Sequence, residues 1–119
     1  MQRQVVEFNR LFNLPISDTP AVLVLEPQFE KVAEEFHELQ DGIRDKDIVR
    51  VVDGVVDLIY STIGVATICG FNIEPFYDEI HKTNMTKIRN GARIVKPYGW
   101  EGPLIKEILT SEVARIRVD

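Results

Sequence analysis

Acidic side chains at helical spacing are the residues of this sequence best suited to chemistry. Glu34, Glu35 and Glu38 lie in one segment, and Asp53 and Asp57 lie within a later apolar stretch. Residues four apart share one face of a helix, so the two aspartates point the same way. Hard carboxylate oxygens without matching histidine or cysteine suit Mg²⁺ or Mn²⁺ better than zinc or copper. Because protein-bound Mg²⁺ commonly also binds water and phosphate oxygens, the pattern indicates a phosphate ester or anhydride as substrate.

Other interpretations of the same acids remain open. An ionised carboxylate in a dry core needs a cation, and Arg50, Lys46 or a lysine from the next helix would pair with Asp53 and Asp57. For Glu34 taken alone, a solvated helix face is the favoured interpretation. A di-iron bundle would need Glu-x-x-His on two helices, and the sequence has this spacing once.

A second polar set follows the acidic residues. His81, Asn84 and Lys87 recur at steps of three, so they share one side of a helix. A lysine with two neutral hydrogen-bonding groups can hold phosphate oxygens or a sugar. An exposed polar face explains the same spacing without any ligand.

Hydrophobic periodicity predicts the helices that position these residues. Gly42 is expected to end the second helix, and Asp45 or Asp47 to cap the third. A link this short makes those two helices antiparallel neighbours. The apolar run at 21–25 is expected to be extended. The predicted helices cover residues 2–12, 28–41, 47–69 and 74–88.

The expected core follows from the same pattern. The helix at 47–69 is apolar on nearly all sides, which predicts a buried helix at the centre of a bundle. The second helix carries an apolar stripe at alternating steps of three and four, formed by Phe29, Val32, Phe36, Leu39 and Ile43.

Asn90-Gly91 is a strong hairpin signal, and Pro103 is expected to open a last helix over residues 104–116. Together these features predict an all-α fold, an antiparallel bundle of four to five helices with a short flap or hairpin near the C-terminus. We expect residues 1–119 to form one domain.

Composition narrows the class of protein. The net charge of −5 argues against nucleic-acid or anionic-membrane binding. One cysteine, Cys69, cannot form an internal disulfide, which favours a reducing compartment. The N-terminal segment lacks the apolar core of a signal peptide. Arg50 and the two aspartates argue against a transmembrane role for 47–69, so we expect a cytoplasmic protein.

Three motifs in order resemble a known family. They are EExxEL at 34–39, DGVVDLIYSTIGVA at 53–66 and IHKTNMTK at 80–87. The chain resembles the MazG-like all-α nucleoside triphosphate pyrophosphohydrolases over nearly its whole length. More narrowly, it is similar to the phosphoribosyl-ATP pyrophosphohydrolase-like branch, whose members carry a DGLADLLY-type helix and a VHRSNMSK-type segment.

The resemblance implies a set of metal ligands. The family's ExxE pair corresponds to Glu35 and Glu38, and the aspartate of its second acidic pair corresponds to Asp57. That second pair is often ExxD, whereas this sequence has Gly54 three residues before Asp57. Asp53, four residues before, would stand in for the missing glutamate. The expected cofactor is Mg²⁺, for which Mn²⁺ can substitute.

The resemblance also implies the remaining roles. Glu34 or Glu35 would accept the proton of the attacking water, and Lys87 would stabilise the departing pyrophosphate. Lys96 lies in a downstream stretch that departs from the family's Gly-Lys-rich pattern. The residues expected to bind substrate are His81, Asn84, Lys87 and Lys96.

The implied activity is Mg²⁺-dependent cleavage of a (d)NTP to a (d)NMP and pyrophosphate, in nucleotide-pool house-cleaning. One alternative is a phosphoribosyl-ATP pyrophosphohydrolase of histidine biosynthesis, which uses the same chemistry. Another is a non-catalytic helical dimer that binds a basic partner. The resemblance further implies a homodimer or a dimer of dimers.

Overall fold

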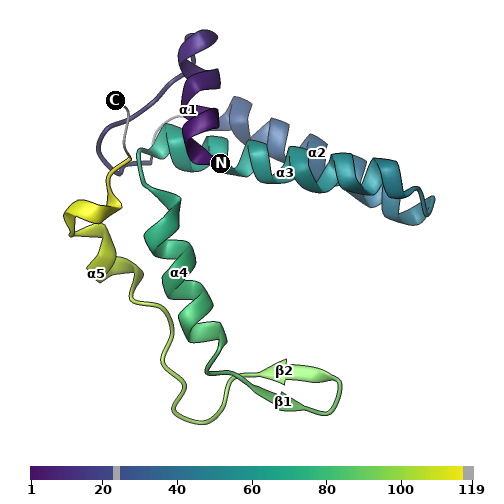
Figure 1. The fold of residues 1–119 in the computed structure, drawn as a ribbon, viewed down its shortest axis with the longest axis vertical. Helices are drawn as coiled ribbons and strands as arrows, with labels where there is room; N and C mark the ends of the chain where they lie inside the picture. Colours follow the sequence, from purple (N-terminus) through teal and green to yellow (C-terminus); the bar gives the residue numbers. More distant parts are fainter. Residues whose placement is uncertain (23–24, 117–119) are drawn as a thin grey trace.

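The computed structural model describes residues 1–22 and 25–116 as two arms that meet at a corner (Figure 1). One arm is a pair of antiparallel helices, and the other is a helix that leads to a β-hairpin and returns through a short helix. In chain order the elements are α1 (Gln2–Leu11), α2 (Glu26–Arg44), α3 (Ile48–Cys69), α4 (Ile73–Asn84), β1 (Ile88–Asn90), β2 (Arg93–Val95), α5 (Ile105–Leu109) and the 3₁₀ turn η1 (Glu112–Ala114). The predicted all-α class with a C-terminal hairpin is confirmed. Of the segment predicted to be extended at 21–25, Leu23 and Val24 lie outside the described residues.

Two glycines set the close packing of α2 against α3. The prediction that Gly42 ends the second helix is wrong, because α2 continues through it to Arg44. A Cβ on Gly42 would lie 3.1 Å from the Cβ of Arg50 on α3. A Cβ on Gly54 would lie 2.9 Å from the Cα of Leu39 on α2. The missing side chains therefore let the two helices approach closely, which aligns the acidic residues of both.

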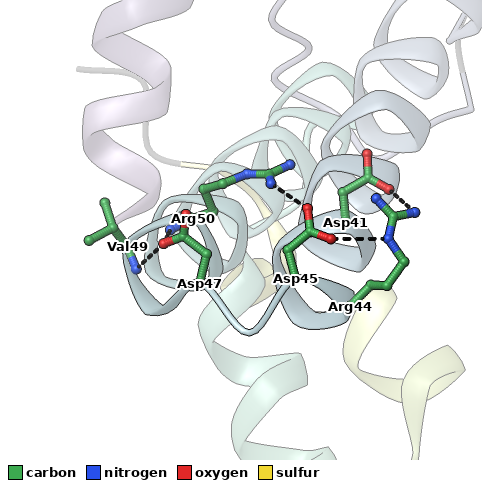
Figure 2. A network of polar contacts seen from close by, with 6 residues as sticks. All are labelled: Asp41, Arg44, Asp45, Asp47, Val49 and Arg50. Atoms are coloured by element: carbon green, nitrogen blue, oxygen red, sulfur yellow. Dashed lines mark hydrogen bonds and ion pairs between the residues drawn. The ribbon is translucent and has the colours of Figure 1, made fainter.

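Charged side chains fix the turn between α2 and α3 (Figure 2). Asp47 caps α3, since its Oδ1 accepts hydrogen bonds from the backbone amides of Val49 at 3.1 Å and Arg50 at 3.3 Å. Asp45 accepts from Arg50 Nη1 at 2.8 Å and from Arg44 Nε at 3.3 Å. Exposed pairs of this kind add little to the free energy of folding. Their main consequence is that the Arg50 guanidinium is held at the turn.

The core lies at the corner, where α1, the end of α3, the start of α4 and the C-terminal segment meet (Figure 1). The side-chain Nε2 of Gln2 donates to Phe71 O at 2.8 Å, and its Oε1 accepts from the Ile73 amide at 2.9 Å. α3 ends at Gly70, whose φ of 78° belongs to the left-handed region. A Cβ there would lie 2.6 Å from Ser17 O, so the corner needs glycine. The buried apolar side chains include Val5, Val6, Ile63, Ala66, Ile68, Phe76, Ala114 and Ile116.

The second arm begins with α4, which ends at Asn84 rather than at the predicted residue 88. The helix stops because other groups satisfy its terminal carbonyls. The carbonyl of Thr83 accepts from Thr86 Oγ1 at 2.6 Å and from Trp100 Nε1 at 3.2 Å. Residue 88, predicted to be helical, instead begins β1.

β1 and β2 pair antiparallel, with Ile88 opposite Val95, so the hairpin indicated by Asn90-Gly91 is confirmed. The last predicted helix, 104–116, is too long. It divides into α5, which ends at Leu109, and the separate turn η1.

Large apolar side chains remain exposed along α2 and α3. The predicted core stripe of α2 is only partly buried, since Phe29 is 68% exposed and Phe36 and Ile43 are also exposed. The prediction of a buried third helix holds for its C-terminal half, whereas Ile48, Val49, Val52 and Val56 are exposed. Among the described residues α3 alone is long and apolar enough to cross a membrane, a test that core helices of soluble proteins also pass. One face of the first arm is therefore left uncovered by the other residues among 1–22 and 25–116.

Candidate metal centre

Three of the predicted ligands meet between α2 and α3. Glu35 and Glu38 lie one turn apart on α2, and Asp57 faces them from α3. One carboxylate oxygen from each lies within 4.8 Å of the other two. This is close to the spread of oxygens around a single Mg²⁺, about 4 Å. The antiparallel pairing and the glycine contacts described above produce this convergence.

Glu35 is the most buried of the three, with its side chain 6% exposed. Its Oε1 pairs with Lys31 Nζ at 2.9 Å, whereas its Oε2 has no hydrogen-bond partner among the described residues. A buried charged oxygen without a partner costs about 1–3 kcal/mol or more. A cation bound at Oε2 would remove this cost, so the carboxylate set fits Mg²⁺ or Mn²⁺.

The electrostatics of the cluster also favour a bound cation. The pKa of Glu38 is raised, chiefly by the negative charge of Glu35. The pKa of Asp57 is raised first by burial and then by the charges of Asp53 and Glu35. Ionised carboxylates therefore repel one another here, and a bound cation would relieve this repulsion.

Side-chain cations do not neutralise the aspartates in the described part of the chain. Arg50, one of the candidate partners, pairs with Asp45 at the turn instead (Figure 2). No lysine or arginine among residues 1–22 and 25–116 lies within ion-pair distance of Asp53 or Asp57. Lys31 contacts Glu35, and the geometry therefore favours the metal interpretation over the ion pair.

The other two predicted acids lie outside the convergent oxygens. Glu34 is 68% exposed and lies 3.8 Å from Lys31 Nζ. Asp53 is exposed, one turn before Asp57, and its role as a ligand stays a prediction. Gly54 occupies the position where the resembling family often has glutamate. Its contact with the backbone of α2 leaves no room for a side chain at this helix spacing.

The residues predicted to bind substrate lie on the other arm. His81 and Asn84 belong to the last turn of α4, and Lys87 and Lys96 flank the β-hairpin. The turn at Gly70 directs α4 away from α2 and α3, as Figure 1 shows. Within one copy of the chain, the structure therefore does not bring this basic set to the acidic cluster.

Two residues gain importance only in the structure. Lys31 lies four residues before Glu35, a spacing that signals a helical ion pair. Trp100 contacts both Lys87 and Lys96, with each Nζ at 5.4 Å and 4.9 Å from the ring centroid. No local pattern reveals that contact, because it depends on the fold of the hairpin.

The fold and its acidic cluster define an all-α pyrophosphohydrolase of the MazG-like superfamily. Residues 5–84 match the family described as PRA-PH, phosphoribosyl-ATP pyrophosphohydrolase, and the chain belongs to this family. The resemblance stated from the motifs is thus confirmed. No curated protein matches the chain. The match covers the acidic cluster and ends at Asn84, so the hairpin and Trp100 lie beyond it. Membership indicates an enzyme that hydrolyses a phosphoric anhydride bond.

Proposed function

We propose that this protein is an Mg²⁺-dependent nucleoside triphosphate pyrophosphohydrolase that cleaves a (d)NTP to a (d)NMP and pyrophosphate. The observation that carries the proposal is the unpartnered, buried Oε2 of Glu35, which lies among the converging carboxylates. Membership of a pyrophosphohydrolase family supplies the reaction class. Disposal of surplus or non-canonical nucleotides is the role that this activity would serve.

Each residue has a defined part in this proposal. Glu35, Glu38 and Asp57 hold the metal. When bound, Mg²⁺ would supply charge neutralisation at the phosphates and acidify a coordinated water. Glu34, exposed beside Glu35, accepts the proton of the attacking water. Lys87 binds phosphate oxygens and stabilises the charge that develops on pyrophosphate.

The proposal includes a second copy of the chain, as a homodimer or a dimer of dimers. Two observations support it. One is the exposed apolar face of α2 and α3, and the other is the separation of the second arm, with Lys87 and Lys96, from the acidic cluster. A protein monomer rarely leaves so much contiguous apolar surface exposed. We propose that the second copy covers this face and places its own Lys87 and Lys96 near the cluster. We propose no membrane and no nucleic acid as partner.

Mixed variants test this shared site. Asp57→Asn and Lys87→Ala homodimers are each expected to be inactive. After unfolding and refolding together, half of the dimers combine both variants and retain one intact site, so about a quarter of wild-type activity returns. If the mixture stays inactive while native mass spectrometry shows mixed dimers, each site is built from one chain.

The family match supports a second substrate equally well. Phosphoribosyl-ATP has the same scissile anhydride, and its cleavage serves histidine biosynthesis. To decide between the two substrates, pyrophosphate release is measured with canonical and modified (d)NTPs and with phosphoribosyl-ATP. In the cellular test, the protein is expressed in a histidine auxotroph that lacks phosphoribosyl-ATP pyrophosphohydrolase, and growth without histidine is measured.

Metal dependence tests the common chemistry. Mg²⁺ is expected to be required for pyrophosphate release, and Glu38→Gln and Asp57→Asn are expected to abolish it. Activity that survives both substitutions refutes the site. If no metal effect and no hydrolysis are found, the non-catalytic helical dimer with a basic partner becomes the better explanation.

A further inference from the structure

The segment around the β-hairpin carries a concentrated positive charge. Residues 80–100 contain five lysines and arginines and no aspartate or glutamate, within a chain of net charge −5. Among the described residues, Lys87 and Lys96 have no carboxylate within ion-pair distance. These two lysines flank the hairpin at the end nearest α4.

The hairpin brings the two lysines into opposition. Ile88 pairs with Val95 in the antiparallel register. Continuing that register by one residue places Lys87 opposite Lys96. Like charges directly opposite each other destabilise a hairpin. Local stability therefore does not explain this pair, and an anion bound between the two ammonium groups would.

The ring of Trp100 lies beside Lys87 and Lys96. The ring has Lys87 Nζ at 5.4 Å and Lys96 Nζ at 4.9 Å from its centroid. Both ammonium groups lie within the roughly 6 Å reach of a cation–π interaction. The indole face thus offsets part of the repulsion while leaving the hydrogen-bond donors of both lysines available to a ligand.

Hydrogen bonds from the ring and from the backbone hold the indole in this place, among them the contact of Nε1 with Thr83 O at 3.2 Å. Its Nε1 donates to Thr86 Oγ1 at 2.8 Å, beside the end of α4. The Trp100 amide donates to Pro97 O at 3.0 Å, which closes a turn. Gly99 has a φ of 76°, as a type II turn requires at its third residue. The turn therefore directs the ring back toward the lysines.

We propose that Trp100 is a positioning residue that holds Lys87 and Lys96 as a clamp for the polyphosphate of the substrate. The identity of the ligand rests on the proposed function, whereas the clamp itself rests on the contacts above. Trp100 acts through the lysines, which bind the anion. Its position beyond residue 84 means that the family match does not include it.

Intrinsic fluorescence reports directly on this clamp, because Trp100 is the sole tryptophan of the chain. The wild-type protein is titrated with inorganic tripolyphosphate in metal-free buffer at constant ionic strength, and calorimetry measures binding in parallel. A saturable change in emission is expected, which the Lys87→Gln/Lys96→Gln variant loses and Asp57→Asn keeps. Absence of binding, binding without a change in emission, or a change that the lysine variant keeps would overturn the proposal.

Variants at the ring separate positioning from general stability. Calorimetry with tripolyphosphate is expected to show about five- to tenfold weaker binding for Trp100→Ala, with Trp100→Phe between it and the wild type. Gly99→Ala is expected to weaken binding while the ring is intact. The exposed Tyr98 gives the matched control, because Tyr98→Ala should bind as the wild type does.

A cycle of variants completes the test. Adding Trp100→Ala to Lys87→Gln/Lys96→Gln should cause no further loss, since the ring acts through the lysines. Equal affinity of Trp100→Ala and wild type, with both folded by circular dichroism, contradicts the clamp. Failure of metal-dependent pyrophosphate release with the fluorescence response intact would instead contradict the proposed function alone.

Discussion

Removing one carboxylate from the cluster should make the metal-free protein more stable and end its response to Mg²⁺. The pKa of Asp57 is raised by burial and by the neighbouring acids, so its ionised form is disfavoured in the folded state at neutral pH. Asp57→Asn removes that charge and places an amide donor in the cluster that holds the unpartnered Glu35 Oε2. We therefore expect a higher melting temperature for metal-free Asp57→Asn than for the wild type.

The metal response has a calculable size. A ligand that binds only the folded state, at a hundred times its dissociation constant, adds about 2.7 kcal/mol of stability. A chain of 119 residues has an unfolding entropy of about 0.25 kcal/mol/K near its midpoint. Saturating Mg²⁺ should therefore raise the melting temperature of the wild type by about 10 °C and leave that of Asp57→Asn unchanged.

Calorimetric or dichroic melts measure the change in metal-free stability and the response to Mg²⁺. All melts use one protein concentration, because assembly would make stability depend on concentration. Tyr98→Ala, far from the acidic arm, is the control and should respond to Mg²⁺ as the wild type does. A destabilised metal-free Asp57→Asn that still gains stability from Mg²⁺ would refute both the electrostatic argument and the assigned site.

Three further predictions follow from the same geometry. The pKa values of Glu38 and Asp57 are raised in the folded protein, so protonation of these groups favours the folded state. The stability of the metal-free wild type should therefore rise as pH falls from 7 toward these pKa values. Chemical denaturation across that pH range, with a chelator present, measures this effect. Gly54→Ala should cost about 1–3 kcal/mol, because its Cβ would meet the Leu39 backbone at 2.9 Å, whereas Gly102→Ala, with its nearest atom at 3.5 Å, should change little. Glu34→Gln should lower kcat and keep the Mg²⁺-dependent rise in melting temperature, since this exposed side chain does not join the convergent oxygens; loss of that rise would make Glu34 a ligand.

The sequence predicted the helices and most of the acidic cluster because both depend on local spacing. Periodicity located α1 to α4, Asp47 was one of the two residues expected to cap α3, and Asn90-Gly91 marked the hairpin. Glu35 and Glu38 lie one turn apart on α2 and meet Asp57 of α3, and the family resemblance implied these three residues as ligands. Helix geometry explains the spacing within each helix, and the resemblance supplied the choice of residues.

The failures share a different cause, namely contact between segments distant in sequence. Gly42 was expected to end a helix, but the approach of α3 requires a small residue inside α2. α4 stops early because Trp100, from beyond the hairpin, donates to the carbonyl of Thr83. Phe29 and Phe36 lie on the predicted apolar stripe, yet the described residues of one chain do not cover them fully. Periodicity shows which face is apolar and not what covers it.

The corner near Gln2 has a consequence for the order in which the chain folds. The α2–α3 pair joins neighbours in sequence through a tight turn, whereas the Gln2 side chain reaches Phe71, 69 residues away. Contacts between near neighbours form faster than those that must close long loops. We therefore expect the helical hairpin to form early and the corner to close late. In the proposed dimer, the apolar face of the early α2–α3 pair stays exposed until a second copy binds, so refolding should slow on dilution and lose yield to aggregation when concentrated.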